Sequence, residues 1–175
     1  MLTVLGRATS SNVQAVIWGL EELGLQYERL DYGETYGGLD SPEFWPGDPL
    51  ARAEVDMWAE WAKHDVAEGF TGPVFWRVVR TPRAQWDVAA IGKAVDRLEH
   101  HLTIAEKRLE QHDFLCGEVL SLADIMLGHV LYRYFDIEIE RREYPALRAY
   151  YDRLAKRPAY QKAVMISYEV LRDTI

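Results

Sequence analysis

The most constraining feature of this 175-residue sequence is an apolar stretch at residues 120–134, LSLADIMLGHVLYRY. Between residues 122 and 131 its only formal charge is Asp124, and apolar side chains cover every face of a helix with 3.6 residues per turn. A helix that is apolar all round is normally buried. We therefore expect this segment to be the central helix of the core.

The start of this helix is specified by its side chains. Ser121 at the N-cap can accept a hydrogen bond from the amide of Asp124, whose carboxylate can reach back to the amide of Ser121. This is a capping box with Asp where Glu is more common, and Leu120 and Ile125 can form a hydrophobic staple across it. Such a cap also occurs on ordinary helices, but its coincidence with all-round apolarity favours the buried position.

Composition limits the class of protein and its partners. Hydrophobic residues make up 49% of the chain and charged residues 27%, which is typical of a soluble globular protein. The net charge of -8 and the pI near 5.1 argue against nucleic acid or an anionic membrane as partner, and favour small molecules or proteins. The single cysteine, Cys116, permits no internal disulfide.

Two further absences favour a cytoplasmic location. No apolar run approaches the roughly 18 residues that span a bilayer, and residues 1–4 lack the basic start of a secretory signal.

Because Cys116 follows Leu115, we expect it to pack rather than to act as a nucleophile. The five histidines show no metal-ligand spacing, so we expect no metal. Glu21 and Glu22 are expected on a solvated face.

The N-terminal part predicts a βαβ unit. Residues 2–5 and 26–31 are strand-like, and the apolar positions between them recur at helical spacing until Gly24, a C′ residue. Such a unit makes the two strands parallel neighbours. The loop after the first strand then faces a ligand, because the helix N-terminus presents unpaired amides. It carries four polar residues: Thr9, Ser10, Ser11 and Asn12.

The chemistry of this loop leaves two alternatives. A hydroxyl at a helix N-terminus can donate a hydrogen bond to an anion such as a thiolate, which the helix dipole also favours. Alternatively, Ser10 or Ser11 is simply the N-cap. The glycines that follow, Gly33, Gly37 and Gly38, lack the spacing of a dinucleotide-binding loop.

From residue 46 onward every signal is helical, so we place a domain boundary between residues 1–45 and 46–175. Asp48 and Pro49 open a helix expected to reach about residue 68. It has a second apolar face, which implies a partner or a ligand. Four aromatic residues are the expected wall of an apolar substrate pocket, although aromatics of this kind are more often core: Trp58, Trp61, Phe75 and Trp76.

Three more helices complete the predicted bundle. A helix over residues 87–111 has apolar residues at alternating spacings of four and three, which is a bundle seam. A helix over residues 144–155 follows the central one, and residues 159–172 are expected to form the last helix. The predicted class is α+β and mostly helical, with an incomplete βαβ part before an all-α bundle.

Four segments of this pattern resemble the cytosolic glutathione transferase family. They are residues 3–25, TVLGRATSSNVQAVIWGLEELGL; residues 37–44, GGLDSPEF; residues 120–125, LSLADI; and residues 144–164, YPALRAYYDRLAKRPAYQKAV. The resemblance implies a thioredoxin-like N-terminal domain docked on an all-helical domain of glutathione transferase type, usually as a homodimer. It also implies glutathione as cosubstrate, conjugated to a small hydrophobic electrophile or used to reduce one.

The resemblance also assigns residues. The family's thiol-activating hydroxyl falls on Ser10, with Ser11 as the alternative, and related bacterial members place an asparagine where this chain has Asn12. These residues, with Thr9, would bind glutathione and lower the pKa of its thiol by hydrogen bonding, without a covalent serine intermediate.

The sequence departs from the family after Phe44. Roughly forty residues of the family pattern have no counterpart, and they include the cis-proline strand that pairs with the glutathione cysteine and the serine that holds its γ-glutamyl carboxylate. What remains is a two-stranded sheet with open edges. We favour a natural polypeptide that carries this segment over a remnant that depends on the helical domain. If the gap is genuine, we expect weak or absent glutathione binding, and a non-catalytic binding or scaffold protein becomes the alternative function.

Overall fold

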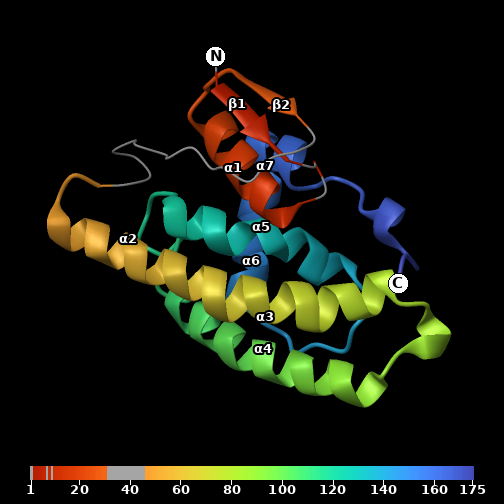
Figure 1. The fold of residues 1–175 in the computed structure, drawn as a ribbon. Helices are drawn as coiled ribbons and strands as arrows, with labels where there is room; N and C mark the ends of the chain where they lie inside the picture. Colours follow the sequence, from red (N-terminus) through yellow and green to blue (C-terminus); the bar gives the residue numbers. More distant parts are fainter. Residues whose placement is uncertain (1, 7, 9, 31–45) are drawn as a thin grey trace.

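The computed structural model describes residues 2–6, 8, 10–30 and 46–175. A small βαβ unit lies on one side of a larger helical bundle (Figure 1). The unit consists of β1 (Leu2–Leu5), α1 (Ser11–Glu22) and β2 (Tyr27–Leu30). The bundle contains α2 (Pro49–Trp61), α3 (Glu68–Phe70), α4 (Val88–Leu109), α5 (Leu122–Asp136), α6 (Pro145–Ala155) and α7 (Pro158–Ala163).

The predicted βαβ unit is confirmed. β1 and β2 pair in parallel, with Leu2 opposite Tyr27 and Leu5 opposite Leu30, and they form a two-stranded sheet within the described residues. Gly24 follows α1 with a φ of +63°, in the left-handed region that favours glycine at the end of a helix. β2 is shorter than the predicted strand by one residue at its N-terminal end.

The first helical segment of the bundle is longer than predicted. α2 continues through wide, π-type turns at Ala62–Ala67 and Thr71–Arg80, with α3 between them, so the helical path ends at Arg80 instead of about residue 68. Pro73 normally ends a helix because it lacks an amide hydrogen. Here Val74 and Phe75 are buried directly after it, and this tertiary burial outweighs the local signal.

The helices α4 and α6 follow the sequence closely. The Asp87 carboxylate accepts a hydrogen bond from the amide of Ala90 at 2.9 Å and caps α4, and α6 has its predicted bounds. The predicted seam of α4 is buried throughout: Ile91, Val95, Leu98, Leu102, Ala105 and Leu109. One face of α6 is buried as well: Leu147, Tyr150, Tyr151 and Leu154.

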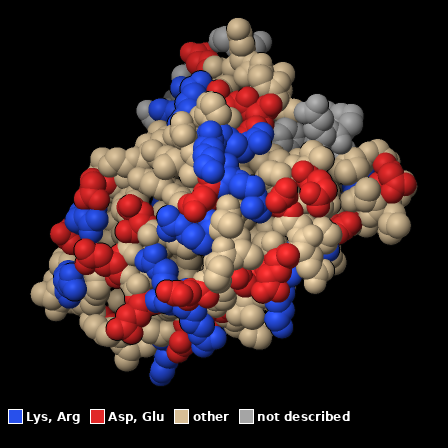
Figure 2. Space-filling model, turned by 180° about the vertical axis from the view of Figure 1, so that it is seen from behind, with Lys and Arg blue, Asp and Glu red and all other residues tan. Residues whose placement is uncertain are grey.

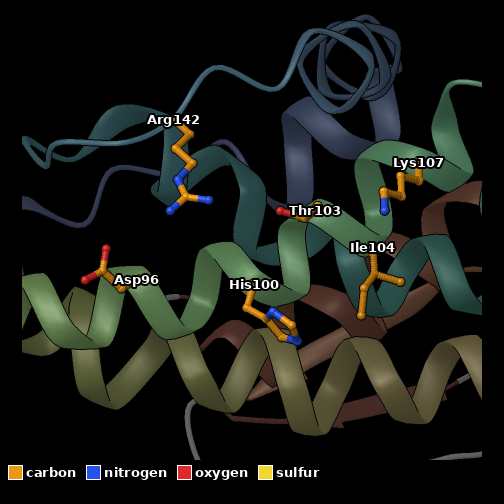
Figure 3. Close-up of a pocket in the computed structure, with 6 residues that line it drawn as sticks. All are labelled: Asp96, His100, Thr103, Ile104, Lys107 and Arg142. Atoms are coloured by element: carbon orange, nitrogen blue, oxygen red, sulfur yellow. The ribbon is translucent and has the colours of Figure 1, made fainter.

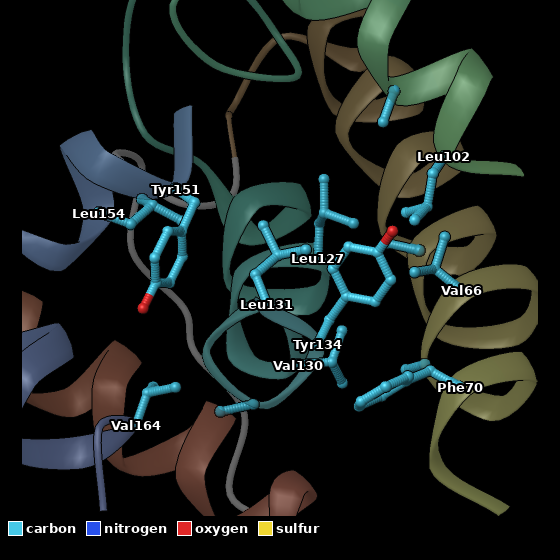
Figure 4. Close-up of a cluster of buried hydrophobic side chains, with 14 of the residues drawn as sticks. Val66, Phe70, Leu102, Leu127, Val130, Leu131, Tyr134, Tyr151, Leu154 and Val164 are labelled. Carbon is cyan, nitrogen blue, oxygen red and sulfur yellow. The ribbon is translucent and has the colours of Figure 1, made fainter. Parts of the chain in front are cut away.

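The helix α5 is the predicted central helix of the core. It packs against α1, α2, α6 and the π-type turns, and Leu127 and Leu131 have no exposed surface. Figure 4 shows these residues and Tyr134 surrounded by side chains of the neighbouring helices. The predicted capping box between Ser121 and Asp124 is present.

The carboxylate of Asp124 connects three elements of the bundle. Its Oδ1 accepts hydrogen bonds from the amide of Leu115 at 2.9 Å and the hydroxyl of Tyr150 at 3.1 Å. Its Oδ2 accepts them from the amide and hydroxyl of Ser121, at 2.8 and 3.0 Å. Burial raises the pKa of Asp124, while these four donors lower it. The carboxyl group thereby fixes the loop before α5, the start of α5 and the middle of α6 relative to one another.

The C-terminal segment corrects the predicted helix over residues 159–172. α7 ends at Ala163, and only a short 3-10 turn follows at Glu169–Leu171. Tyr168 is buried and its hydroxyl bonds to the carboxylate of Asp136. The amide of Asp173 donates to the carbonyl of Val79 at 3.0 Å. The tail therefore bonds to the distant end of the first helical segment instead of continuing its own helix.

The docking of α1 on the bundle corrects a second prediction. Glu21 and Glu22 do not form a solvated face: their side chains are 18% and 9% exposed and form ion pairs with Lys162 and Arg157. The reason is that α7 lies beside α1 (Figure 1), which a local sequence pattern does not reveal.

Trp18 is the apolar centre of this docking surface. It has no exposed surface, its ring meets that of Tyr160 edge to face at 4.9 Å, and its Nε1 donates to Glu22 at 2.8 Å. Gly128 on α5 makes the approach possible, because a Cβ there would lie 2.8 Å from the Trp18 ring and 2.7 Å from Leu154.

This close approach generates a stability prediction. Gly128→Ala is expected to lower the free energy of unfolding by about 1–3 kcal/mol, because Trp18 and Leu154 must move to admit the methyl group. Gly92→Ala is the matched control: a Cβ at Gly92 in α4 would meet no atom within 4 Å, so this variant should gain about 0.5–1 kcal/mol of helix propensity. Urea denaturation of both variants measures the difference, and equal effects would contradict the interpretation.

His129 on α5 generates a pH prediction. Its Nδ1 lies 3.2 Å from the carbonyl oxygen of Ile125, and burial lowers the pKa of the ring to about 4 from an ordinary value of 6.5. Between these values the unfolded chain binds a proton that the native protein does not. Stability should therefore be unaffected by His129 above pH 6.5 and fall by up to about 1.4 kcal/mol per pH unit as the pH decreases toward 4.

The variant His129→Gln isolates this contribution from the titration of acidic residues. Urea denaturation at several pH values should show a smaller loss of stability on acidification for His129→Gln than for the wild type. Parallel curves for the two proteins would show that His129 does not cause the loss.

Candidate functional site

A groove of about 340 Å³ lies where α1 of the βαβ unit meets α2 and α5 of the bundle. The floor contributed by α5 is apolar, whereas α2 contributes small and charged side chains. The residues that line the groove are Asn12, Ala15, Val16, Asp56, Ala59, Glu60, Lys63, Leu122, Ile125 and Met126. Three segments distant in the sequence thus form one site.

Hydrogen bonds and close packing hold Gly6 and Ala8, two described residues between β1 and α1. Gly6 has a φ of +148°, and a Cβ there would lie 2.4 Å from Val13, so this turn requires glycine. Arg29 donates to the carbonyl of Gly6 at 2.7 Å, and Gln14 donates to that of Ala8 at 3.0 Å. Arg29 and Gln14 were not predicted as supports of this loop, because neither belongs to a local motif.

Ser10 occupies the N-cap position of α1, but its hydroxyl does not cap the helix. Its backbone is extended and its carbonyl accepts from the amide of Gln14 at 2.9 Å, while its side chain makes no cap hydrogen bond. Ser11 is the first residue of α1, and Asn12 lines the groove. Thr9 lies outside the described residues. The first turn of α1 contains no acidic residue, so its free amides favour binding of an anion close to Ser10.

The four predicted aromatic residues do not form a wall of this groove. Trp58 and Trp61 meet edge to face at 5.2 Å, and Phe75 is buried 5.1 Å from the ring of Tyr168. Trp76 is 46% exposed and lies beneath Arg80.

The wall from α2 and the π-type turn after it is another stripe of this helical segment, which was not predicted from the sequence. Asp56, Glu60 and Lys63 stand at spacings of four and three and share one face with Ala59. This stripe has no apolar periodicity that distinguishes it from an ordinary solvated face. Its two carboxylates and one ammonium group lie at the same groove as the apolar floor from α5.

Cys116, the single cysteine of the sequence, is half-buried. Burial raises the pKa of its thiol to about 11, so it is not an activated nucleophile. Within the described ranges, no three metal-ligating side chains gather, and no helix is long and apolar enough to cross a membrane. Basic and acidic side chains are interspersed on the face shown in Figure 2.

Comparisons with known proteins agree with the fold. Residues 87–153 match the family described as Glutathione S-transferase, C-terminal domain. The apo structure of a theta class glutathione S-transferase from Xanthomonas axonopodis pv. citri is 35% identical, with a TM-score of 0.87, over 95% of this chain and 99% of that one. The chain therefore belongs to the glutathione S-transferase family.

Two further comparisons add detail. The Xanthomonas protein is also similar in its form with glutathione bound, at 33% identity and a TM-score of 0.84, over 94% of this chain and 97% of that one. GstB of Escherichia coli K12 is 25% identical over 206 residues, which include 95% of this chain and 99% of GstB.

The length of the GstB comparison bears on the predicted gap. Because 206 aligned positions contain only 95% of a 175-residue chain, about 40 residues of GstB have no counterpart here. This confirms that the chain is shorter than a full-length relative by the expected amount. The position of the gap after Phe44 stays a prediction, since residues 31–45 lie outside the described part.

Proposed function

We propose that this protein is a glutathione transferase that joins the sulfur of glutathione to a small hydrophobic electrophile in the groove between α1, α2 and α5. The observation that carries the proposal is the Ser10 hydroxyl, which stands at the N-terminus of α1 without capping it. The family of the chain and the glutathione bound to the Xanthomonas relative support it.

The chemistry follows from the residues around the thiol position. The hydroxyl of Ser10 donates a hydrogen bond to the glutathione sulfur, and the amides of the first turn of α1 favour its negative charge, so the pKa of the thiol falls. The thiolate attacks the electrophilic carbon, a carbon–sulfur bond forms and the leaving group departs with its electron pair. Ser10 stays uncharged and forms no covalent bond. Asn12 is a second proposed donor toward glutathione.

In this proposal the electrophile, which is the second substrate, binds in the groove. Leu122, Ile125 and Met126 present an apolar surface to the electrophile, and burying that surface draws the electrophile out of water. Holding the two reactants together converts a bimolecular step into an effectively unimolecular one.

Ser10→Ala tests the proposed role of the hydroxyl. We expect kcat/KM for conjugation of glutathione to a chlorodinitrobenzene to fall by about 100-fold. This is the effect expected from removing one hydrogen-bond donor, the Ser10 hydroxyl, to the glutathione thiolate. The pH dependence of the rate should move to higher pH, because the thiol is less acidic without the donor.

Ser11→Ala is the matched control for this experiment. It removes a hydroxyl one residue away at the start of the same helix, and we expect activity within about threefold of the wild type. An equal loss in both variants would show a general effect of the helix start, and loss only in Ser11→Ala would assign the role to Ser11.

The two-stranded sheet favours a second candidate function. The segment expected to pair with the cysteine of glutathione and to hold its γ-glutamyl carboxylate has no counterpart in the chain, which lowers the expected affinity for glutathione. In this alternative the groove binds an apolar ligand without catalysis. Two results together would support the alternative. The wild-type protein would not be retained on immobilised glutathione, and it would bind a hydrophobic dye that the variant Met126→Arg does not bind.

We also propose that the protein forms a homodimer through the outer side of α2. Leu50 and Met57 are 81% and 59% exposed, and they stand seven residues apart on one stripe of this helix. Exposed apolar side chains that share a helix face are typical of an interface with another protein.

Met57→Lys tests the dimer. Light scattering of the wild type should give twice the 20.2 kDa of the chain, and Met57→Lys should give 20.2 kDa, because a lysine charge is costly to bury in an interface. Val119→Lys is the control, since Val119 is 69% exposed on the loop before α5. A wild type of 20.2 kDa would refute the dimer.

A further inference from the structure

A second hollow, of about 430 Å³, lies on the outer side of α4 and shares no lining residue with the groove. Figure 3 shows its side chains: five come from α4 and one, Arg142, comes from the connection between α5 and α6. The lining residues are Asp96, His100, Thr103, Ile104, Lys107 and Arg142. We call this the α4 hollow.

Arg142 is held in place by a buried carboxylate. Its Nε lies 3.0 Å from Oε2 of Glu99, and its amide donates to Oε1 of Glu99 at 2.6 Å. Glu99 is 3% exposed, whereas the Arg142 side chain is 67% exposed. Within the described residues the two terminal amino groups of Arg142 have no hydrogen-bond partner. Glu99 therefore orients the guanidinium from behind and leaves its two terminal amino groups open to a ligand.

The residues of α4 extend this cationic surface. His100, Thr103 and Lys107 stand at spacings of three and four and share one face of the helix. Lys107 forms no ion pair within the part of the chain that the structure describes. The acidic residue next to it, Glu106, accepts hydrogen bonds from the amides of Ala146 and Leu147 at 2.9 and 2.8 Å and is therefore engaged elsewhere.

The charge of the α4 hollow contrasts with that of the chain. Lys107 and Arg142 outweigh Asp96, the one carboxylate that lines the hollow, in a protein with a net charge of -8. Arg142 is paired with the buried Glu99, as Arg108 is with Glu54. Lys107, in contrast, has no ion pair within the described residues, and its charge on a concave surface attracts an anion.

The geometry points to an oxyanion-binding site in the α4 hollow, which takes a phosphate or carboxylate group of a small ligand. Arg142 donates from its two terminal amino groups to the oxyanion, Lys107 contributes its charge, and the ring of His100 lies along the same helix face. The hydroxyl of Thr103 donates to the carbonyl of Glu99 at 2.8 Å and is therefore engaged within the helix. The hollow is larger than one such group, and Ile104 offers an apolar contact to the remainder of the ligand. The site is independent of the proposed transferase reaction.

The test uses inorganic phosphate and the ¹⁵N-labelled protein at constant ionic strength. Titration with phosphate should give saturable chemical-shift changes in the amides of residues 96–107 and 142, and titration with sodium chloride should not. The exposed substitution Lys107→Glu should weaken binding at least tenfold without affecting the fold. Lys93→Ala removes an exposed lysine from the same helix outside the hollow, so binding should stay within twofold of the wild type.

Two further measurements complete the test. Arg142→Gln should weaken phosphate binding at least tenfold, and comparison of phosphate with acetate distinguishes a phosphate-binding site from a carboxylate-binding one. Linear shifts that chloride reproduces, or equal affinity in Lys107→Glu and the wild type, would overturn the proposal. Because Lys107 is exposed, this second criterion holds even if Arg142→Gln fails to fold.

Discussion

The interaction on which the rest of the structure depends is the set of four hydrogen bonds to the buried carboxylate of Asp124. A buried carboxyl group without partners would be strongly destabilising, so its donors must be held together in the native state. They come from Leu115, Ser121 and Tyr150, and they fix how α5 enters the core. Leu122, Ile125 and Met126 lie in the turns that begin there, so the same carboxylate positions the apolar floor of the candidate groove.

The βαβ unit docks on the bundle through α1. The centre of this contact is apolar, since the buried Trp18 packs against α5 and α7. Ion pairs of Glu21 with Lys162 and of Glu22 with Arg157 add polar contacts beside the apolar ones. This docking places Asn12 at the groove, beside residues of α2 and α5.

Charged residues have two different roles in this protein. Most ion pairs at helix contacts are structural, as between Arg108 and Glu54 or Arg157 and Glu22. In the α4 hollow, by contrast, the buried Glu99 orients Arg142 and leaves its terminal donors open. The groove and the hollow therefore offer different chemistry, since the first has an apolar floor beside a helix N-terminus and the second has Lys107 of α4 opposite Arg142.

The sequence by itself determined the features that depend on neighbouring residues. The cap formed by Ser121 and Asp124, the start of α6 at Pro145, the glycine after α1 and the seam of α4 are local or periodic signals, and all four are confirmed. The family resemblance added the loop that carries Ser10. Only the tertiary structure decided that the helical path continues past Pro73, that the chain after Ala163 bonds to Val79, and that Asp56 and Lys63 face the groove. These outcomes depend on which distant segments meet, because burial and long-range hydrogen bonds outweigh local preference where the two disagree.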